Sequence, residues 1–488
     1  MTGRPRATCS SGIGERTTDL KRAEDLKRAD EEYSQQPCAA AAMKDADRDA
    51  LIAGGPCALV DARLIDGIAD EPLERGFVRV RGGWIAQVGA MADFRRAGGE
   101  ERLVELGGRT LLPGLIDCHV HFVYAGFRSL EEIDRCPVET AAINGILNGE
   151  RMLEAGYTTV RDVGTIGNVA VAVRDAIAAG KVRGPRVIAS GQIIGPTSGM
   201  TDTLPGHWSK SAGLGVCVDG PEAIVREVRR QIKAGVDNIK LGASGVEVGP
   251  YAYTWMTTLS AEEIAAAVAE AHRWGRTVAV HCQSFDAAKF ALRAGADTIE
   301  HGTRLDDEAL ALFAASRTAL VPTLSTLFSV LELGETLNLM PKQREEMAVN
   351  KAHWLSAVAR AREANVLVGA GSDIGNRYPH GKNAREVEFL VRAGLTPMQA
   401  VQSATGNAAR TLGKEGSVGT LAPGAFADLL VVDGNPLEDV RTLADPERVR
   451  LVVLEGRMVA GRELERANRV RLPVSSPITP WRPREPSH

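Results

Sequence analysis

The feature that most constrains the fold is a regular alternation of short apolar strands with amphipathic helices between about residue 112 and residue 413. Helical periodicity is clear in Pro221–Ala234, Ala261–Trp274 and Lys342–Ala364. The strand candidates begin near Leu111, Thr158, Arg186, Val236, Thr277, Thr298, Ala319 and Val366. Eight strand–helix units in roughly 300 residues predict an α/β fold, a (β/α)8 TIM barrel with insertions. A doubly wound open sheet is the alternative, but no GxGxxG turn follows the first strand.

Both flanks of this block are rich in short alternating strands. The candidates are Ala58–Ile65, Gly76–Arg81, Trp84–Val88, Ala427–Val432 and Val449–Leu454, with Gly82-Gly83 as a turn signal. We therefore predict a small β-sandwich domain formed from both chain ends, residues 51–111 and 421–475, around a barrel domain of residues 112–420.

Residues 1–50 differ from the rest of the chain. They are polar and contain the near-repeat Asp19–Ala23 and Asp25–Ala29. Mixed charge with few large apolar residues predicts a disordered or weakly helical N-terminal arm. We interpret it as a non-functional extension, with Met43 as an alternative start of the protein.

The bulk properties exclude several classes of function. The formal net charge is −4, without the clustered basic residues that nucleic acids require. No apolar run is long enough to span a membrane, and the N-terminus lacks the apolar core of a secretory signal. The seven cysteines are scattered, without a CxxC pair, which is typical of reduced cysteine. We expect a cytoplasmic homo-oligomer that acts on a small molecule and binds neither nucleic acid nor membrane.

Polar side chains stand at the ends of several predicted strands. His119 and His121 follow the first strand, and side chains two residues apart on an extended chain point to the same face. Imidazole nitrogen is a favoured ligand of zinc and similar ions. An HxH pair alone is weak evidence, because two surface histidines would look the same.

Four further strand ends strengthen this interpretation. Lys240 ends the fourth strand at a position that the pattern buries, and an unpaired buried ammonium is costly. A lysine that has reacted with CO₂ becomes an anionic carbamate able to bridge two metals. His281, His301 and Asp373 end the fifth, sixth and eighth strands. Because barrel enzymes do their chemistry at the carboxyl ends of their strands, the six positions together predict a metal site.

The sequence resembles the amidohydrolase superfamily, in the branch of imidazolonepropionase-related and prolidase-like enzymes. The matching segments are Pro113–His121 (Pro-Gly-Leu-Ile-Asp-Cys-His-Val-His), Ala155–Asp162, Ile239-Lys240, Val280-His281, Glu300–Gly302, Gly371–Asp373, Pro379–Asn383, Ala404–Ala409 and Gly419–Leu429. The resemblance extends from Ala58 to Val459, nearly the whole chain.

The resemblance implies two divalent metal ions per chain, with zinc expected and manganese, cobalt or iron as alternatives. His119, His121 and Asp373 would hold the more buried ion, and His281 and His301 the more exposed one. Carboxylated Lys240 would bridge them. A hydroxide shared by the two metals would attack the substrate. Asp373 would act as the catalytic acid and base, taking the proton of the hydroxide and passing it to the departing amine.

One departure concerns substrate binding. The prolidase-like branch often carries Gly-Gly-His after the third strand, whereas this chain has Met200 in the corresponding stretch. His207 is a candidate substitute, and Met200 itself is a candidate for an apolar pocket. Tyr251 and His380 are further candidates for substrate binding, although aromatic packing and loop ordering explain them equally well.

The reaction implied is hydrolysis of an amide, peptide or carbamate-type C–N bond in a small molecule. N-acyl amino acids, dipeptides, mycotoxin-like amides, carbamates and phenylureas all remain candidate substrates, with a slight preference for xenobiotic or N-aryl amides. The alternatives are a cyclic-amide hydrolase and a mononuclear ring deaminase, and Lys240 disfavours the deaminase. A binding protein without catalysis is disfavoured by the complete ligand set.

Overall fold

The computed structural model describes residues 45–127, 129–205, 207, 213–247, 249, 251–333 and 341–465. The chain divides into two compact units, Met1–Ala41 and Ala42–His488, and every described residue belongs to the second. Most of the predicted N-terminal arm, residues 1–44, therefore lies outside the described residues, as do residues 466–475 of the predicted sandwich. Residues 45–50 belong to helix α2 (Asp45–Ala53).

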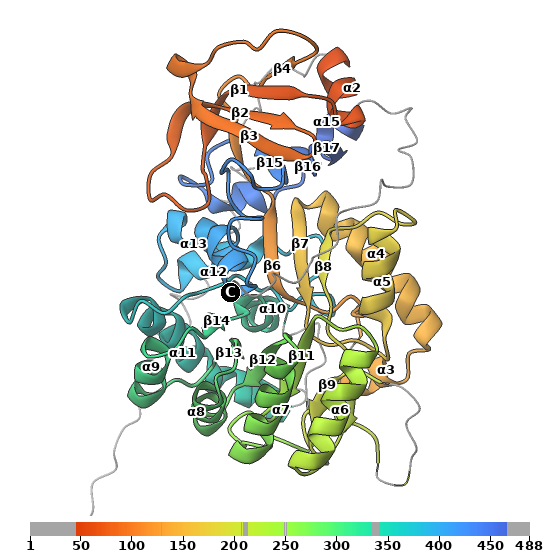
Figure 1. Ribbon diagram of the computed structural model, residues 1–488. Coiled ribbons are helices and arrows are strands. Elements are labelled where there is room, and N and C mark those ends of the chain that lie inside the picture. The colour runs from red at the N-terminus through yellow and green to blue at the C-terminus, as the bar shows by residue number, and fades with distance from the viewer. Residues whose placement is uncertain are drawn as a thin grey trace, which may run out of the picture. The chain divides into compact units, whose positions relative to one another are not determined.

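Strands from both flanks of the chain pair in one eight-stranded sheet (Figure 1). Its strands are β1 (Cys57–Leu64), β2 (Leu73–Arg81), β3 (Trp84–Ala90), β4 (Arg102–Glu105), β5 (Thr110–Pro113), β15 (Leu429–Val432), β16 (Val449–Leu454) and β17 (Arg457–Ala460). The two flanks meet where β5 pairs antiparallel with β15. The contribution of both ends is as predicted. The two-sheet sandwich is not confirmed, because the described strands of this region belong to a single sheet.

The central block contains parallel strands separated by helices. One sheet has the order β6-β7-β8, and a second has the order β10-β9-β11-β12-β13-β14. The strands are β6 (Leu115–Val120), β7 (Tyr157–Asp162), β8 (Arg186–Ile188), β9 (Ile193–Gly195), β10 (Gly215–Cys217), β11 (Asn238–Gly242), β12 (Thr277–Cys282), β13 (Thr298–His301) and β14 (Ala319–Val321).

The helices of the chain follow the predicted alternation. They are α3 (Leu130–Asp134), α4 (Val138–Glu154), α5 (Val169–Ala178), α6 (Pro221–Lys233), α7 (Ala261–Arg273), α8 (Phe285–Ala294), α9 (Asp307–Ala314), α10 (Leu324–Leu333), α11 (Pro341–Glu363), α12 (Arg385–Arg392), α13 (Pro397–Ser403), α14 (Gly406–Thr411) and α15 (Arg462–Glu465), with short 3-10 turns η1 (Met91–Asp93) and η2 (Val440–Leu443). The three helices predicted by periodicity are α6, α7 and α11, each within one residue of its predicted ends. In the described part of the chain no helix has both the length and the apolar character needed to cross a membrane.

Hydrogen bonds link the edges of the two parallel sheets. A parallel bridge joins Ser190, just after β8, to Asn238 of β11. At the other edge a bridge joins Leu320 to Val368, and the backbone N–H of Cys118 donates to Ala370. The links follow the strand order that a barrel requires, but the assigned strands form two sheets rather than one closed barrel.

Two predicted strands differ from those observed. The eighth strand, expected near Val366, is reduced to the bridge at Val368. The first parallel strand begins at Leu115, whereas Leu111 belongs to β5 of the other sheet. Gly114 lies between the two sheets, and a Cβ there would come within 2.1 Å of the Thr158 hydroxyl. The sequence pattern is continuous across this glycine, so it does not reveal that the chain changes sheets.

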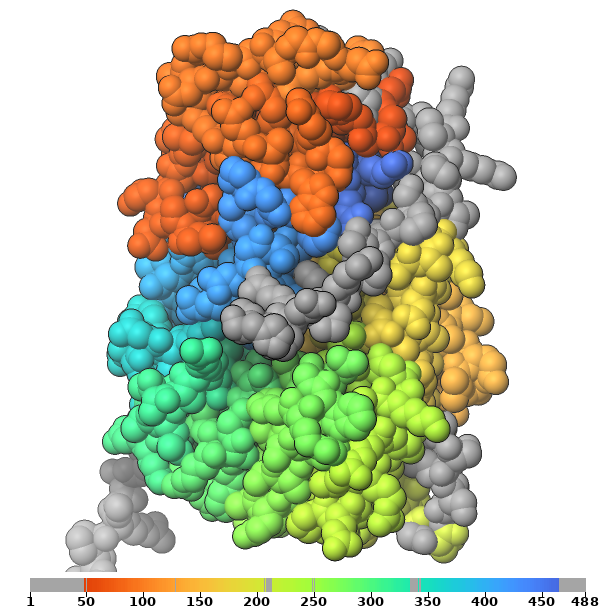
Figure 2. Space-filling model, in the orientation of Figure 1, coloured from red at the N-terminus to blue at the C-terminus, as the bar shows by residue number. Residues whose placement is uncertain are grey.

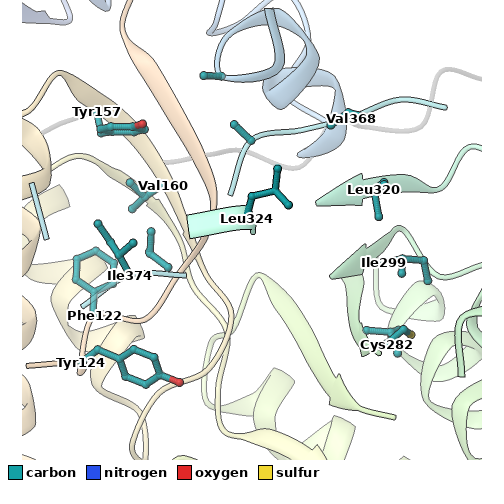
Figure 3. Close-up of a cluster of buried hydrophobic side chains, with 14 of the residues drawn as sticks. Phe122, Tyr124, Tyr157, Val160, Cys282, Ile299, Leu320, Leu324, Val368 and Ile374 are labelled. Atoms are coloured by element: carbon teal, nitrogen blue, oxygen red, sulfur yellow. The ribbon is translucent and has the colours of Figure 1, made fainter. Parts of the chain in front are cut away.

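The main hydrophobic core lies between the parallel strands and their helices. Figure 3 shows Tyr157 and Val160 of β7 on one side of this core and Ile299 and Leu320 of β13 and β14 on the other. On the outside, residues 220–315, coloured green, present a continuous surface in the space-filling view (Figure 2). Burial of these apolar side chains is the main source of stability in this region, and it holds the ends of the parallel strands in place.

Candidate metal centre

A cavity of about 350 Å³ collects all six residues predicted to bind metal. They come from the ends of β6, β11, β12 and β13 and from the segment after the Val368 bridge. The six that line the cavity wall are His119, His121, Lys240, His281, His301 and Asp373. Each is nearly or fully buried except Asp373, whose side chain is 14% exposed. The structure thus brings together side chains that are more than 250 residues apart in the sequence.

His119 and His121 direct the same ring nitrogen toward one carboxylate. Nδ1 of His119 donates to Oε2 of Glu300 at 2.6 Å, and Nδ1 of His121 donates to the carbonyl of Gly164 at 2.8 Å. Their Nε2 atoms then lie 3.7 and 3.4 Å from Oδ1 of Asp373. A hydrogen bond at one nitrogen fixes the tautomer and leaves the other nitrogen with a lone pair for a metal.

His281 and His301 form a second pair, with ring centroids 4.5 Å apart. Nε2 of His281 donates to the carbonyl of Gly245 at 3.0 Å, which leaves its Nδ1 available. Nδ1 of His301 is hydrogen-bonded to the hydroxyl of Thr323 at 2.6 Å, which leaves its Nε2 available. All four imidazoles are therefore oriented by a partner outside the cluster.

Burial keeps the imidazoles of His119, His281 and His301 neutral. It lowers the pKa of His281 to about 4, with a further contribution from the charge of Lys240. Burial and the same lysine lower the pKa of His119 well below its usual value, and burial together with His281 does so for His301. A neutral imidazole is the form that coordinates a metal.

Asp373 adds a carboxylate oxygen to this cluster of ring nitrogens. One ligand atom each of His119, His301 and Asp373 lies within 4.8 Å of the others. Burial alone would raise the pKa of Asp373, but the neighbouring His119 and His121 outweigh it and hold the pKa below its usual range. His301 and Asp373 have φ angles of 67° and 48°. Such left-handed backbone at residues other than glycine costs roughly 1 kcal/mol or more each and is concentrated at functional sites.

Lys240 is the most unusual member of the group. It is 1% exposed, and its Nζ has no hydrogen-bond partner among the described residues. Burial lowers the pKa of its ammonium to about 8. A buried amine without a partner is unfavourable as it stands. It fits a site in which the amine is carboxylated and its two oxygens meet cations.

A buried ion network behind the cluster was not predicted. Glu300 accepts from His119 and from Nη2 of Arg161, at 2.7 Å, and both Glu300 and Arg161 are buried. Asp117 accepts from the backbone N–H groups of His119 and Ser372, both at 3.0 Å. Glu300 and Arg161 both occur in the motifs that carry the resemblance, but their pairing depends on the contact of two distant strands.

The predicted substrate-binding residues are not gathered in one place. Met200 lines the cavity, and a Cβ on Gly242 would come within 2.9 Å of its sulfur.

The other three predicted residues lie away from the described cavity wall. Tyr251 is 47% exposed, and His207 is also exposed. His380 is buried behind Gly375 rather than in the cavity wall. The cavity wall also contains polar side chains that were not predicted: Tyr124, Glu247, Gln283, Asn376 and Arg377.

Comparison with known proteins gives a consistent result. The profile of the Amidohydrolase family matches residues 110–459. The chain is 29% identical over 423 residues to ochratoxinase of Aspergillus niger, covering 80% of this chain and 84% of that protein. It is 28% identical over 378 residues to imidazolonepropionase of Ralstonia nicotianae, covering 72% of this chain and 85% of that protein.

A solved structure of similar sequence shares the fold. The crystal structure of a Xaa-Pro dipeptidase with bound methionine in the active site is 32% identical to this chain, with a TM-score of 0.76. The match covers 83% of this chain and 100% of the dipeptidase chain.

Proposed function

Because the chain belongs to the amidohydrolase family and is a hydrolase, we propose that it uses two divalent cations to cleave an amide-type C–N bond in a small molecule. The observation that carries the proposal is the orphaned Nζ of Lys240 in a cavity shared with four imidazoles and a carboxylate. This donor set of nitrogen and oxygen suits zinc, with manganese, cobalt and iron as alternatives.

The proposed ligand assignment follows the hydrogen bonds of the rings. His119 and His121 would bind one cation through Nε2, together with Asp373, because their Nδ1 atoms are engaged elsewhere. His281 would bind the second cation through Nδ1, and His301 through Nε2. Lys240, as a carbamate, would supply one oxygen to each cation.

The proposed architecture is a (β/α)8 barrel of residues 112–420 with a small β domain built from residues 51–111 and 421–475. The support is the parallel order of the strands and the bridges between the edges of the two sheets. In such a barrel the carboxyl ends of the strands form the active-site face.

The residues of the chain have separate tasks in the reaction. Divalent cations, when bound, acidify water and polarise a carbonyl group, which is the chemistry that amide hydrolysis needs. Asp373, held ionised by its neighbours, accepts the proton of the attacking water and returns it to the amine nitrogen that leaves. The hydroxyl of Thr326 donates to Oδ2 of Asp373 at 3.1 Å and keeps that carboxylate aimed into the cavity.

The first test measures metal content and hydrolysis together. We expect about two ions per chain by elemental analysis of zinc- or manganese-loaded protein. A panel of N-acyl amino acids, dipeptides, cyclic amides, carbamates, phenylureas and anilides should contain substrates. Lys240→Ala should lower the metal content of the protein. It should also lower kcat/KM by about 100-fold or more. Lys233→Ala, on the exposed face of α6, is the matched control.

Two results would contradict the proposal. One is full activity and full metal content in Lys240→Ala. The other is a single ion per chain with ammonia released from a ring, which would favour the mononuclear deaminase. The similarity to imidazolonepropionase supports a third candidate, a cyclic-amide hydrolase, which the cyclic members of the panel test directly.

A further inference from the structure

The segment that carries Asp373 lies directly against strand β6, which carries His119. The backbone N–H of Asp373 donates to the carbonyl of His119 at 2.8 Å, and that of Cys118 donates to Ala370 at 2.8 Å. A Cβ on Gly371 would come within 2.7 Å of the Cβ of His119, so the approach requires glycine at this position. The contact between these two segments therefore determines how Asp373 faces the histidines of β6.

The side chain of Asp117 connects the same two segments. Its Oδ1 accepts the backbone N–H groups of His119 and Ser372, both at 3.0 Å. Its Oδ2 accepts the hydroxyl of Ser372 at 2.5 Å and Nδ2 of Asn383 at 2.8 Å. Asp117, Ser372 and Asn383 are each no more than 1% exposed. A buried carboxylate that accepts from several donors at once holds their backbone segments in a fixed arrangement.

Asp373 depends on such support because its backbone is strained. Its φ of 48° lies in the left-handed region, which residues other than glycine adopt only where the surrounding structure holds them. In this conformation Oδ1 of Asp373 lies 3.7 Å from Nε2 of His119 and 3.4 Å from Nε2 of His121. Asp117 holds the preceding residue, Ser372, at both its backbone N–H and its hydroxyl.

We propose that Asp117 is a positioning residue, which holds Asp373 against His119 and His121 and so sets the affinity for the cation that these three would bind. The inference rests on the proposed assignment of the two cations. Asp117 is absent from the cavity wall in the described part of the chain, so it acts through the ligands rather than as one of them. The four hydrogen bonds of its carboxylate reach only β6 and residues 372–383, whereas the second cation would be held from β12 and β13.

An amide cannot replace the carboxylate of Asp117 in this network. In Asp117→Asn the new Nδ2 would face Nδ2 of Asn383, so that two donors meet. Turning the amide of Asn383 would bring its Nδ2 against the backbone N–H of Gly381, which donates to Oδ1 of Asn383 at 3.0 Å. Turning the amide at position 117 would oppose the backbone N–H groups of His119 and Ser372. Each arrangement leaves donors opposed in a buried place, which is costly.

The double variant Asp117→Asn/Asn383→Asp reverses the pair and satisfies every donor again. The amide oxygen at position 117 accepts the same two backbone N–H groups, and the amide nitrogen donates to the carboxylate at position 383. That carboxylate still accepts the N–H of Gly381, and the hydroxyl of Ser372 donates to position 383 instead of position 117. The chain therefore offers a rescue that a merely destabilising substitution would lack.

The test measures the affinity of metal-free protein for zinc by titration in competition with a chelator. We expect Asp117→Asn to weaken one of two zinc sites by about 10- to 100-fold and the other by no more than about 3-fold. The double variant should return to within about 3-fold of the wild-type affinity. At saturating zinc, kcat of Asp117→Asn should fall by about 10-fold with KM nearly unchanged, because Asp373 accepts a proton in the proposed reaction.

A milder variant covers the case in which Asp117→Asn does not fold. Ser372→Ala removes one of the four donors and should weaken the same zinc site by about 3- to 10-fold. Apolar packing also holds the two segments, since Ile374 belongs to the same cluster as Phe122 (Figure 3). The fold of Ser372→Ala should therefore persist.

Asp428→Asn is the matched control. Asp428 is also a buried carboxylate that accepts a backbone N–H, from Glu455 at 2.9 Å, but it is not among the described residues that line the cavity. This variant should keep both zinc affinities even where its free energy of unfolding falls. Crystal structures of the metal-free proteins give the second readout. Asp117→Asn should move Oδ1 of Asp373 by about 1 Å or more from its place beside His121.

The outcomes separate this inference from the proposed function. Unchanged zinc affinities in Asp117→Asn, or equal weakening of both sites without rescue by the double variant, would overturn the inference and leave the proposed hydrolysis intact. If wild-type protein binds fewer than two cations, the proposed function fails. The crystal structures then decide the inference, because an unmoved Asp373 in Asp117→Asn overturns it and a displaced Asp373 supports it.

Discussion

At the scale of single residues, Glu300 connects the candidate metal centre to the buried charge behind it. One oxygen accepts from Nδ1 of His119 and the other from Nη2 of Arg161. Glu300 is fully buried, and the Arg161 side chain is 2% exposed. Removing one partner of a buried ion pair leaves the other charge buried and uncompensated, here the guanidinium of Arg161.

We therefore expect Glu300→Gln to destabilise the metal-free protein by about 3 kcal/mol or more. Urea unfolding at neutral pH measures the free energy of unfolding. Glu308→Gln is the matched control, because Glu308 pairs with Arg293 at the surface and both side chains are about half exposed. That change should cost less than about 1 kcal/mol. Equal stability of the two variants would show that the buried network contributes no more than a surface pair.

At the scale of elements, helix α10 links the cavity wall that contains Asp373 to helix α12. Glu386 of α12 accepts the first backbone N–H groups of α10, from Leu324 at 2.8 Å and from Ser325 at 2.7 Å. It thus acts as an N-terminal cap supplied by another helix. Burial raises the pKa of Glu386 to about 8. The next residue of α10 is Thr326, whose hydroxyl donates to Asp373.

Removal of this cap should affect both stability and catalysis. We expect Glu386→Ala to lower the free energy of unfolding by about 1–2 kcal/mol and kcat by about 10-fold, because Thr326 loses its position against Asp373. Ser260→Ala removes the capping box of α7 and should cost about 1 kcal/mol with kcat unchanged. A normal kcat in Glu386→Ala would mean that the start of α10 does not position the carboxylate.

At the scale of the whole molecule, the buried imidazoles make stability depend on pH. The pKa of His281 is about 4 in the folded protein because of burial, and those of His119 and His301 are also lowered. In the unfolded chain they return to the ordinary value near 6.5. Between these values the unfolded state binds more protons than the folded state, so stability falls as the pH falls.

We expect metal-free protein to be fully stabilised by these groups above about pH 6.5 and to lose that stabilisation toward about pH 4. His281 alone accounts for about 3 kcal/mol of this change. Urea unfolding at about pH 7.5 and about pH 5 measures the average slope of stability against pH, and His281→Asn should reduce that slope by roughly half a proton. An unchanged slope in His281→Asn would show that this imidazole does not titrate between the folded and unfolded states.

Much of the fold and of the candidate site was predictable because the relevant signals are local. The apolar character that buries a strand is a property of consecutive residues, so six of the eight predicted strand positions correspond to parallel strands of the structure. A polar residue at the end of an apolar run marks the carboxyl end of a parallel strand. His119, Lys240, His281 and Asp373 could therefore be identified one by one, and the structure brings them to one cavity.

The pairing of distant side chains was decided by tertiary packing alone. The Glu300–Arg161 pair, the stacking of Tyr124 on His121 and the approach of Gly375 to Tyr124 each join segments that share no local pattern. The exposure of Tyr251 could not be predicted from the sequence either. An aromatic residue after a strand gives the same sequence pattern whether it covers a cavity or faces solvent. The sequence by itself determined which residues are placed at strand ends, since that depends on local hydrophobicity. The tertiary structure decided which of them meet, since contact depends on how the whole chain closes around its core.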